Sequence, residues 1–211
     1  MPGVEEVLEL RSTFGFLAFH GGSLERGTDR IAAEAARISG ASVYAVVQPP
    51  GLRVHLPSIE VTPDASPKLR AFLDHVEVTV AVHGYGRHGL WSTLLLGGRN
   101  RDLAAHVGAL LEGALDDHHV CTDLDAIPDG LRGLHRDNPV NRCRGTGVQL
   151  ELPPGVRGLT PRWASWSGPG LPPPTEALVG ALAEAARTWP DQGASRSVRQ
   201  TGAPARPGTR E

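Results

Sequence analysis

Two histidines of this 211-residue chain each come directly after an apolar run. His20 follows residues 14–19 and His83 follows residues 76–82, and each is followed by glycine. Such runs are typical of buried strands, and α/β sheets bind ligands at the carboxyl ends of their strands. With Glu25, the histidines form the ligand set of a catalytic zinc site whose fourth position is left to water. Alternatively, the histidines end strands by chance and Glu25 begins a solvated helix.

Glu151 is the second carboxylate whose position suggests chemistry. It lies inside the apolar run 148–152, where a charge is costly unless it is paired or faces a site. A zinc hydrolase needs such a group to take a proton from water and return it to the leaving amine. The alternative is a Glu that faces outward from an edge strand.

Two loops offer candidate substrate-binding residues. Asn141 and Arg142 lie in the stretch NPVNR, and a guanidinium suits carboxylate recognition because it presents a rigid fork of donors. Arg144 competes with Arg142 for this role. Tyr85 and Arg87 follow His83, where they would shape the site or stabilise an oxyanion. In both loops, a purely structural role is the alternative.

Other residues of these types give no pattern. His55, His75, His106 and His135 have no partner visible in the sequence. No GxSxG stretch indicates a serine hydrolase, and the stretch Gly97–Asn100 lacks the Lys-Ser/Thr pair of a phosphate-binding loop.

Strands and helices are expected to alternate along the chain. The apolar patterns predict strands over 14–20, 42–47, 76–82, 91–96, 119–124 and 146–152. They predict helices over 28–38, from 66 onward, over 100–117 and over 175–189, with Thr28 and Ser66 as N-caps. An edge strand is expected within residues 1–12, and a short strand and loop within 52–64. This alternation favours an α/β sheet covered on both faces.

Composition restricts the classes of function. The length predicts one domain over residues 1–189, and the unpatterned end predicts a disordered tail over 190–211. The net charge of -2 and the absence of a basic block argue against nucleic acid as a partner. Two cysteines indicate reduced thiols. Neither a signal peptide nor a membrane-spanning run is recognisable, so we expect a cytoplasmic monomer.

Five segments, taken together, resemble the poly-γ-glutamate hydrolase family of bacteria and their phages, many of whose members are labelled phage-related replication proteins. The segments are HGGSLERGT (20–28), VAVHGY (80–85), LLLGGRN (94–100), NPVNR (138–142) and GTGVQLEL (145–152). The resemblance implies a zinc carboxypeptidase-like fold, with a mixed, mostly parallel sheet between helices. It implies one zinc ion bound by His20, Glu25 and His83, and Glu151 as general base.

The activity implied is hydrolysis of γ-glutamyl amide bonds in a polyanionic chain. Such a substrate requires a basic cleft, and the arginines near the motifs are the candidates: Arg87, Arg99, Arg101, Arg142 and Arg144. In zinc carboxypeptidases an Asn-Arg pair precedes the third metal ligand, whereas Asn141 and Arg142 follow it. A non-catalytic binding or replication accessory protein on the same fold is the alternative function. A zinc peptidase of other specificity is another.

Overall fold

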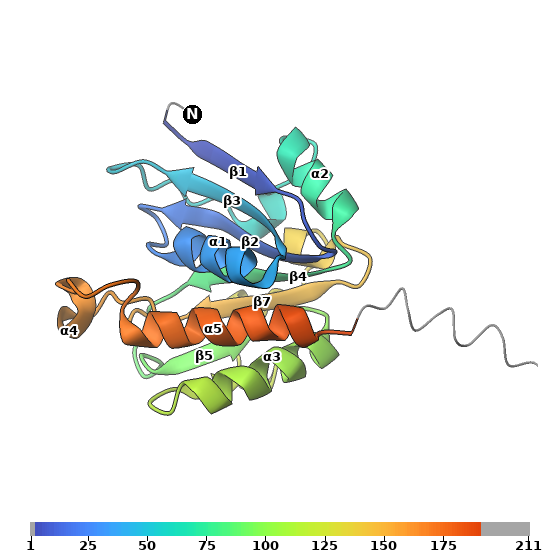
Figure 1. Ribbon diagram of the computed structural model, residues 1–211. Helices are drawn as coiled ribbons and strands as arrows, with labels where there is room; N and C mark the ends of the chain where they lie inside the picture. Colours follow the sequence, from blue (N-terminus) through green and yellow to red (C-terminus); the bar gives the residue numbers. More distant parts are fainter. Residues whose placement is uncertain (1–2, 191–211) are drawn as a thin grey trace, which may run out of the picture.

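The computed structural model describes residues 3–190, through which one seven-stranded sheet runs (Figure 1). Its strands are β1 (Glu5–Glu9), β2 (Phe14–Gly22), β3 (Ser42–Gln48), β4 (Val78–Gly84), β5 (Thr93–Leu96), β6 (His119–Cys121) and β7 (Gly147–Leu152). They lie in the order β1-β3-β2-β4-β7-β5-β6. Strands β3, β2, β4 and β7 are parallel to one another, whereas β1 and β5 run antiparallel to β3 and β7. The prediction of a mixed, mostly parallel sheet is confirmed.

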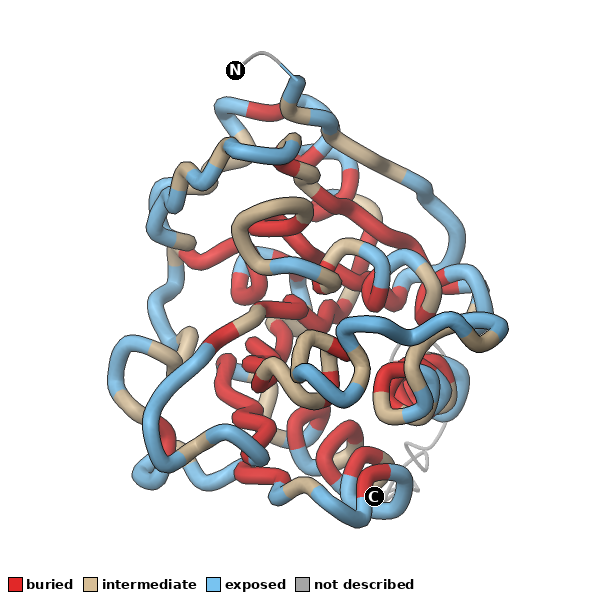
Figure 2. The backbone as a smooth tube through the Cα atoms, turned by 90° about the vertical axis from the view of Figure 1, so that its left-hand side faces the viewer, coloured by how far each residue is buried: buried red, intermediate tan, exposed pale blue. Residues whose placement is uncertain are grey.

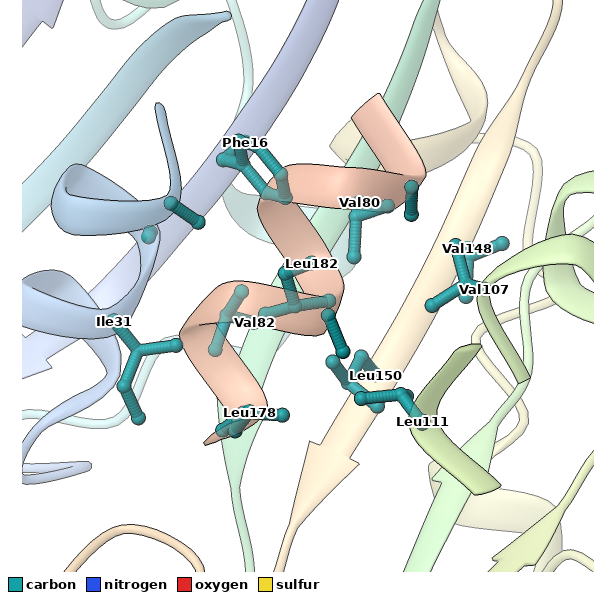
Figure 3. Close-up of a cluster of buried hydrophobic side chains, with 14 of the residues drawn as sticks. Phe16, Ile31, Val80, Val82, Val107, Leu111, Val148, Leu150, Leu178 and Leu182 are labelled. Atoms are coloured by element: carbon teal, nitrogen blue, oxygen red, sulfur yellow. The ribbon is translucent and has the colours of Figure 1, made fainter. Parts of the chain in front are cut away.

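Helices cover the two faces of the sheet unequally. They are α1 (Thr28–Ser39), α2 (Pro67–His75), α3 (Arg101–Ala114), α4 (Pro161–Ala164) and α5 (Pro173–Thr188). Helices α1, α3 and α5 pack on one face and enclose the larger core, which Figure 3 shows. Helix α2 packs on the other face over a smaller core that contains Tyr44 and Phe72. Beyond α2, much of this second face is left to loops, and the cleft described below opens there.

The alternation of side chains along β7 separates core from cleft. Val148, Leu150 and Leu152 join the larger core beneath α3 and α5. Gln149 and Glu151 therefore point to the other face, because successive strand residues face opposite sides of a sheet. Glu151 is thus neither a core charge nor a solvated edge residue.

Several details differ from the sequence predictions. The N-cap of α1 is Gly27 rather than Thr28, whose hydroxyl donates a hydrogen bond to the Glu25 carbonyl instead. Among the described residues, 52–64 form no strand, because side chains rather than a neighbouring strand pair with their backbone. Helix α4 forms between β7 and α5, where the sequence analysis predicts no helix. The expected disordered tail falls, except for Pro190, outside the described residues.

None of the helices within residues 3–190 combines the length and the apolar character that crossing a membrane requires.

Ser66 is expected to stabilise α2 measurably. Its hydroxyl accepts a hydrogen bond from the Leu69 amide at 3.1 Å, which caps the helix as the sequence predicts. Replacing Ser66 with Ala should lower the free energy of unfolding by about 1 kcal/mol, because the amide loses its partner. Chemical denaturation would measure the change. Ser66→Thr, which keeps a capping hydroxyl, is the control, and equal losses in both variants would contradict this role.

Candidate active site

The sheet topology gathers His20, His83 and Glu151 at one edge. They lie at or near the carboxyl ends of β2, β4 and β7, which are neighbours in the sheet. The arrow of β7 in Figure 1 points to this edge, and Figure 2 looks onto it. A cavity of about 810 Å³ opens there. Its walls come from these strand ends, from residues 55–59 and from the loop 129–138.

An irregularity in β2 aims His20 at this cavity. Strict alternation would place His20 on the side opposite Phe19, whose ring belongs to the smaller core. The pairing of β2 with β3 shifts between Ala18 and Gly21, as at a β-bulge. Bulges re-aim a side chain in this way. As a result, the ring centroid of His20 lies 5.2 Å from that of His83 on the neighbouring strand.

Glu25 joins the two strand ends. A tight turn, closed by the Glu25 amide on the His20 carbonyl, brings this carboxylate back over the sheet. One carboxylate oxygen lies 2.9 Å from Nδ1 of His20, and the other lies 3.4 Å from Nδ1 of His83. The amide of Gly84 donates a hydrogen bond to the second oxygen at 2.9 Å. The three groups predicted from the sequence therefore meet in space.

The charges at this junction stabilise one another. Burial alone would raise the pKa of Glu25, but the charge of His83 and the hydrogen bond to His20 outweigh burial and lower it well below its usual range. Burial likewise disfavours a charged His83, yet Glu25 raises the pKa of its ring overall. The carboxylate thus stays ionised at neutral pH, as a metal ligand must be.

The donor types of His20, Glu25 and His83 suit a zinc ion, and their spacing meets that of a zinc site in part. Two ligands of tetrahedral zinc, each bound at about 2.0–2.1 Å, lie roughly 3.3 Å apart. The two Nδ1 atoms lie 2.9 and 3.4 Å from Glu25, close to this value, but each distance is to a different carboxylate oxygen. Nε2 of His20 lies 2.9 Å from the Leu56 carbonyl, which fixes the ring so that Nδ1 presents its lone pair. Nε2 of His83 has no such partner among the described residues.

A second histidine competes for the third ligand position. Among the described residues, the donor atoms of His20, Glu25 and His55 all lie within 4.8 Å of one another. His55 is exposed on a loop, whereas His83 is 4% exposed at the end of a strand. His83 also lies 3.4 Å from Glu25, so we favour it as the ligand. Sequence reasoning did not identify His55, because its contact with His20 joins residues distant in the chain.

Glu151 lies beside the histidine and glutamate group with a partner of its own. Glu151 on β7 is the register partner of His83 on β4. Its carboxylate accepts a hydrogen bond from the Gln149 side chain at 2.9 Å. Asn138 in turn donates to Gln149 at 2.7 Å. Burial, reinforced by the charge of Glu25, raises the pKa of Glu151 despite the opposing effect of His83. A carboxyl with a raised pKa, fixed in a cleft, suits proton transfer.

Arg157 holds together the loops that surround the site. Its guanidinium donates to the carbonyls of Arg26 and Tyr85, at 3.0 and 3.3 Å. It fills the space where a side chain on Gly84 would lie, since an added Cβ would come within 2.5 Å of it. Arg157 therefore joins the loop that follows β7 to the turn that follows β2 and to the loop that follows β4.

The other residues expected to bind substrate lie elsewhere or serve the structure. Tyr85 lines the cavity, but its hydroxyl bonds the carbonyls of Leu90 and Thr93. Arg142 is outside the cavity lining and pairs with Asp137. Arg87 is also outside it.

Asn141 holds the cleft wall in place rather than lining it. Its side-chain amide donates to the carbonyls of Gly133 and His135, whose loop lines the cavity. The arginine that does line the cavity is Arg132, which the sequence did not indicate because it lies in a loop without a motif.

Glu151 should make folding depend on pH in the metal-free protein. Because its pKa is higher in the folded protein than in the unfolded chain, ionisation of Glu151 opposes folding. This cost is absent below the ordinary pKa of about 4.3 and grows as the pH rises above it. Glu151→Gln should therefore raise the Tm of the metal-free protein at pH 7. The gain should shrink toward pH 4, and a gain independent of pH would contradict this reasoning.

Arg157 should contribute to stability through its two carbonyl partners. Arg157→Ala should lower the free energy of unfolding by about 1–3 kcal/mol, because two backbone carbonyls lose a charged donor. Denaturant unfolding would measure it. Arg162→Ala removes an arginine that lies over the ring of Trp163 instead, and serves as the control. Equal stability of Arg157→Ala and the unchanged protein would show that the loops hold without the guanidinium.

Comparison with known proteins places this geometry in context. The chain is 29% identical over 138 residues to the SPbeta prophage-derived UPF0714 protein YoqZ of Bacillus subtilis (strain 168). The match covers 64% of this chain but 47% of YoqZ, so the chain spans about half the length of that relative.

Two solved structures share the fold. A bacteriophage poly-gamma-glutamate hydrolase superposes with a TM-score of 0.72 at 21% identity, covering 92% of this chain and 90% of that one. A structure described as zinc-free YNDL superposes with a TM-score of 0.71 at 19% identity, covering 88% and 90%. The family model for poly-gamma-glutamate hydrolase matches residues 3–160, which include every residue of the candidate site. The chain therefore belongs to the poly-gamma-glutamate hydrolase family.

Proposed function

We propose that this protein is a zinc-dependent hydrolase that cleaves γ-glutamyl amide bonds, with poly-γ-glutamate as its substrate. The observation that carries the proposal is the placement of Glu151 beside His20, Glu25 and His83 in one cavity at the strand ends. Membership of the hydrolase family supports the reaction class, and the zinc-free form described for one structural neighbour supports the metal.

His20, Glu25 and His83 would hold one zinc ion per chain. When bound, zinc lowers the pKa of water and polarises a carbonyl group. Glu151 takes a proton from the attacking water as the new carbon–oxygen bond forms. It then gives the proton to the amide nitrogen, so that the carbon–nitrogen bond breaks and the leaving group departs as an amine. The hydrogen bond from Gln149 keeps the carboxylate oriented toward the cleft.

The cleft wall offers an anionic chain one arginine and two exposed histidines, beside the carboxylates of Glu25, Asp129 and Glu151. Arg132 lines the cavity, and His55 and His135 lie at exposed positions of its lining. The guanidinium of Arg132 is already held by the Ile127 carbonyl and by Asp129, so its place in the wall is fixed. An exposed rim also lets a polymer pass across the site, which favours cleavage within a chain over trimming of one end.

Metal content tests the proposed ligands. The purified protein should contain about one zinc per chain, and His83→Ala should lose it because a buried ligand is gone. His88→Ala, which alters an exposed histidine outside the cavity, is the matched control. Elemental analysis gives the ratio, and a protein that takes up no zinc even after incubation with the ion would overturn the proposal.

Activity of Glu151→Gln tests the base. The variant should keep its zinc and lower kcat on poly-γ-glutamate by roughly 10²- to 10⁴-fold, because Gln cannot accept the proton. Full activity of the variant would refute the role of Glu151. Cleavage of α-linked peptides but not of the polymer would indicate a zinc peptidase of other specificity. Zinc binding without any hydrolysis would indicate a non-catalytic binding protein.

A further inference from the structure

Residues 52–57 form an extended segment that borders the cavity, and we name it the cleft strap. The side chain of Gln48 both donates to the Val54 carbonyl, at 2.7 Å, and accepts from the Val54 amide, at 2.9 Å. His20 Nε2 bonds the Leu56 carbonyl, and the hydroxyl of Ser23 bonds the Leu52 carbonyl. The strap is thus held by side chains from the ends of β2 and β3 and from the turn that follows β2.

His55 is the residue between the two innermost anchors. Val54 and Leu56 are both fastened through their backbone, so the main chain at His55 is fixed from either side. Its ring lines the cavity and lies 4.8 Å, centroid to centroid, from the ring of His20. Among the described residues, neither ring nitrogen of His55 has a hydrogen-bond partner in the protein. The strap therefore presents an imidazole that bonds no described protein group and whose donor atom lies within 4.8 Å of those of His20 and Glu25.

The strand order fixes the side from which His55 approaches. The strap follows β3 and contacts His20 on β2, whereas Glu151 lies on β7. Because the order is β3-β2-β4-β7, the ligands on β2 and β4 lie between His55 and Glu151. A carbonyl group bound over these ligands would have the carboxylate on one side and the imidazole on the other.

We infer that His55 donates a hydrogen bond to the oxygen of the scissile carbonyl as negative charge develops on it. The inference rests on the proposed function. This role requires one N–H donor, and a neutral imidazole carries one. Arg132 is less suited to this role, because its guanidinium is committed to the Ile127 carbonyl and to Asp129. A donor on a fixed backbone costs little reorganisation during the reaction, which makes such hydrogen bonds effective.

Kinetics of His55→Ala give the first test. The variant should keep about one zinc per chain and a KM near that of the unchanged protein, while kcat falls roughly 10²- to 10³-fold, as for the loss of one oxyanion donor. His55→Asn and His55→Gln each place an amide donor near one of the two ring nitrogens, and one of them should recover at least part of kcat. His88→Ala is again the control.

Three results would overturn the inference. Loss of zinc from His55→Ala would make His55 a metal ligand, and a rise in KM alone would make it a substrate-binding residue. An unchanged kcat would leave it without a role in the reaction.

Binding of methylphosphonate to the zinc-loaded protein gives a second test that does not need turnover. This anion is tetrahedral and oxygen-rich like the developing transition state, and it carries no glutamyl group. Calorimetry should show at least about tenfold weaker binding of the anion to His55→Ala. His55→Asn or His55→Gln should recover part of this affinity. Equal affinities would overturn the inference. If the unchanged protein binds the anion through His55 but leaves poly-γ-glutamate intact, the substrate proposal fails and the inference about His55 stands.

Discussion

The arrangement of the site depends on the largely buried carboxylate of Glu25, whose side chain is 12% exposed. It brings the end of β2 to the end of β4 through His20, His83 and the amide of Gly84. Burial of this charge is costly by itself, and only the partners around it keep the group ionised. The same arrangement brings one nitrogen of each of two histidines to this carboxylate. A fold that satisfies this one charge therefore already assembles most of a cation site.

The group that this arrangement destabilises is the ionised carboxylate of Glu151. Its partner Gln149 donates a hydrogen bond, and Asn138 holds Gln149, so the carboxyl is oriented. It is nevertheless buried beside a second carboxylate, which disfavours its ionised form. Groups that are unfavourable for folding and poised for proton exchange are typical of sites that perform chemistry. The alternation of side chains along β7 points the Glu151 carboxyl toward the cleft, so the larger core stays apolar.

The fold was largely predictable from local sequence patterns. The parallel strands are apolar runs that end in glycine or proline, and Ser66-Pro67 marks the start of α2, so their positions follow from short-range signals. The placement of His20 and His83 at one edge also followed from the rule that strand ends lie together, whereas the bulge that turns His20 toward His83 did not. His55 could not be found in this way, because its segment has weak alternation but pairs with side chains of β2 and β3 rather than with a strand. Arg142 shows the opposite error: its loop suggests anion binding, yet the guanidinium pairs with Asp137 within the same loop.

The bulge between Ala18 and Gly21 has a consequence for how this sequence can vary. The extra residue rotates His20 by half a strand period relative to a regular strand. Deletion of Gly21 alone would restore regular pairing. Because His20 would still follow Phe19 directly, strict alternation would then turn the imidazole toward the apolar core beneath α1. Insertions and deletions in β2 should therefore be tolerated far less than exchanges of one apolar side chain for another. Relatives that retain the bulge can diverge in composition along this strand while the position of the imidazole is conserved.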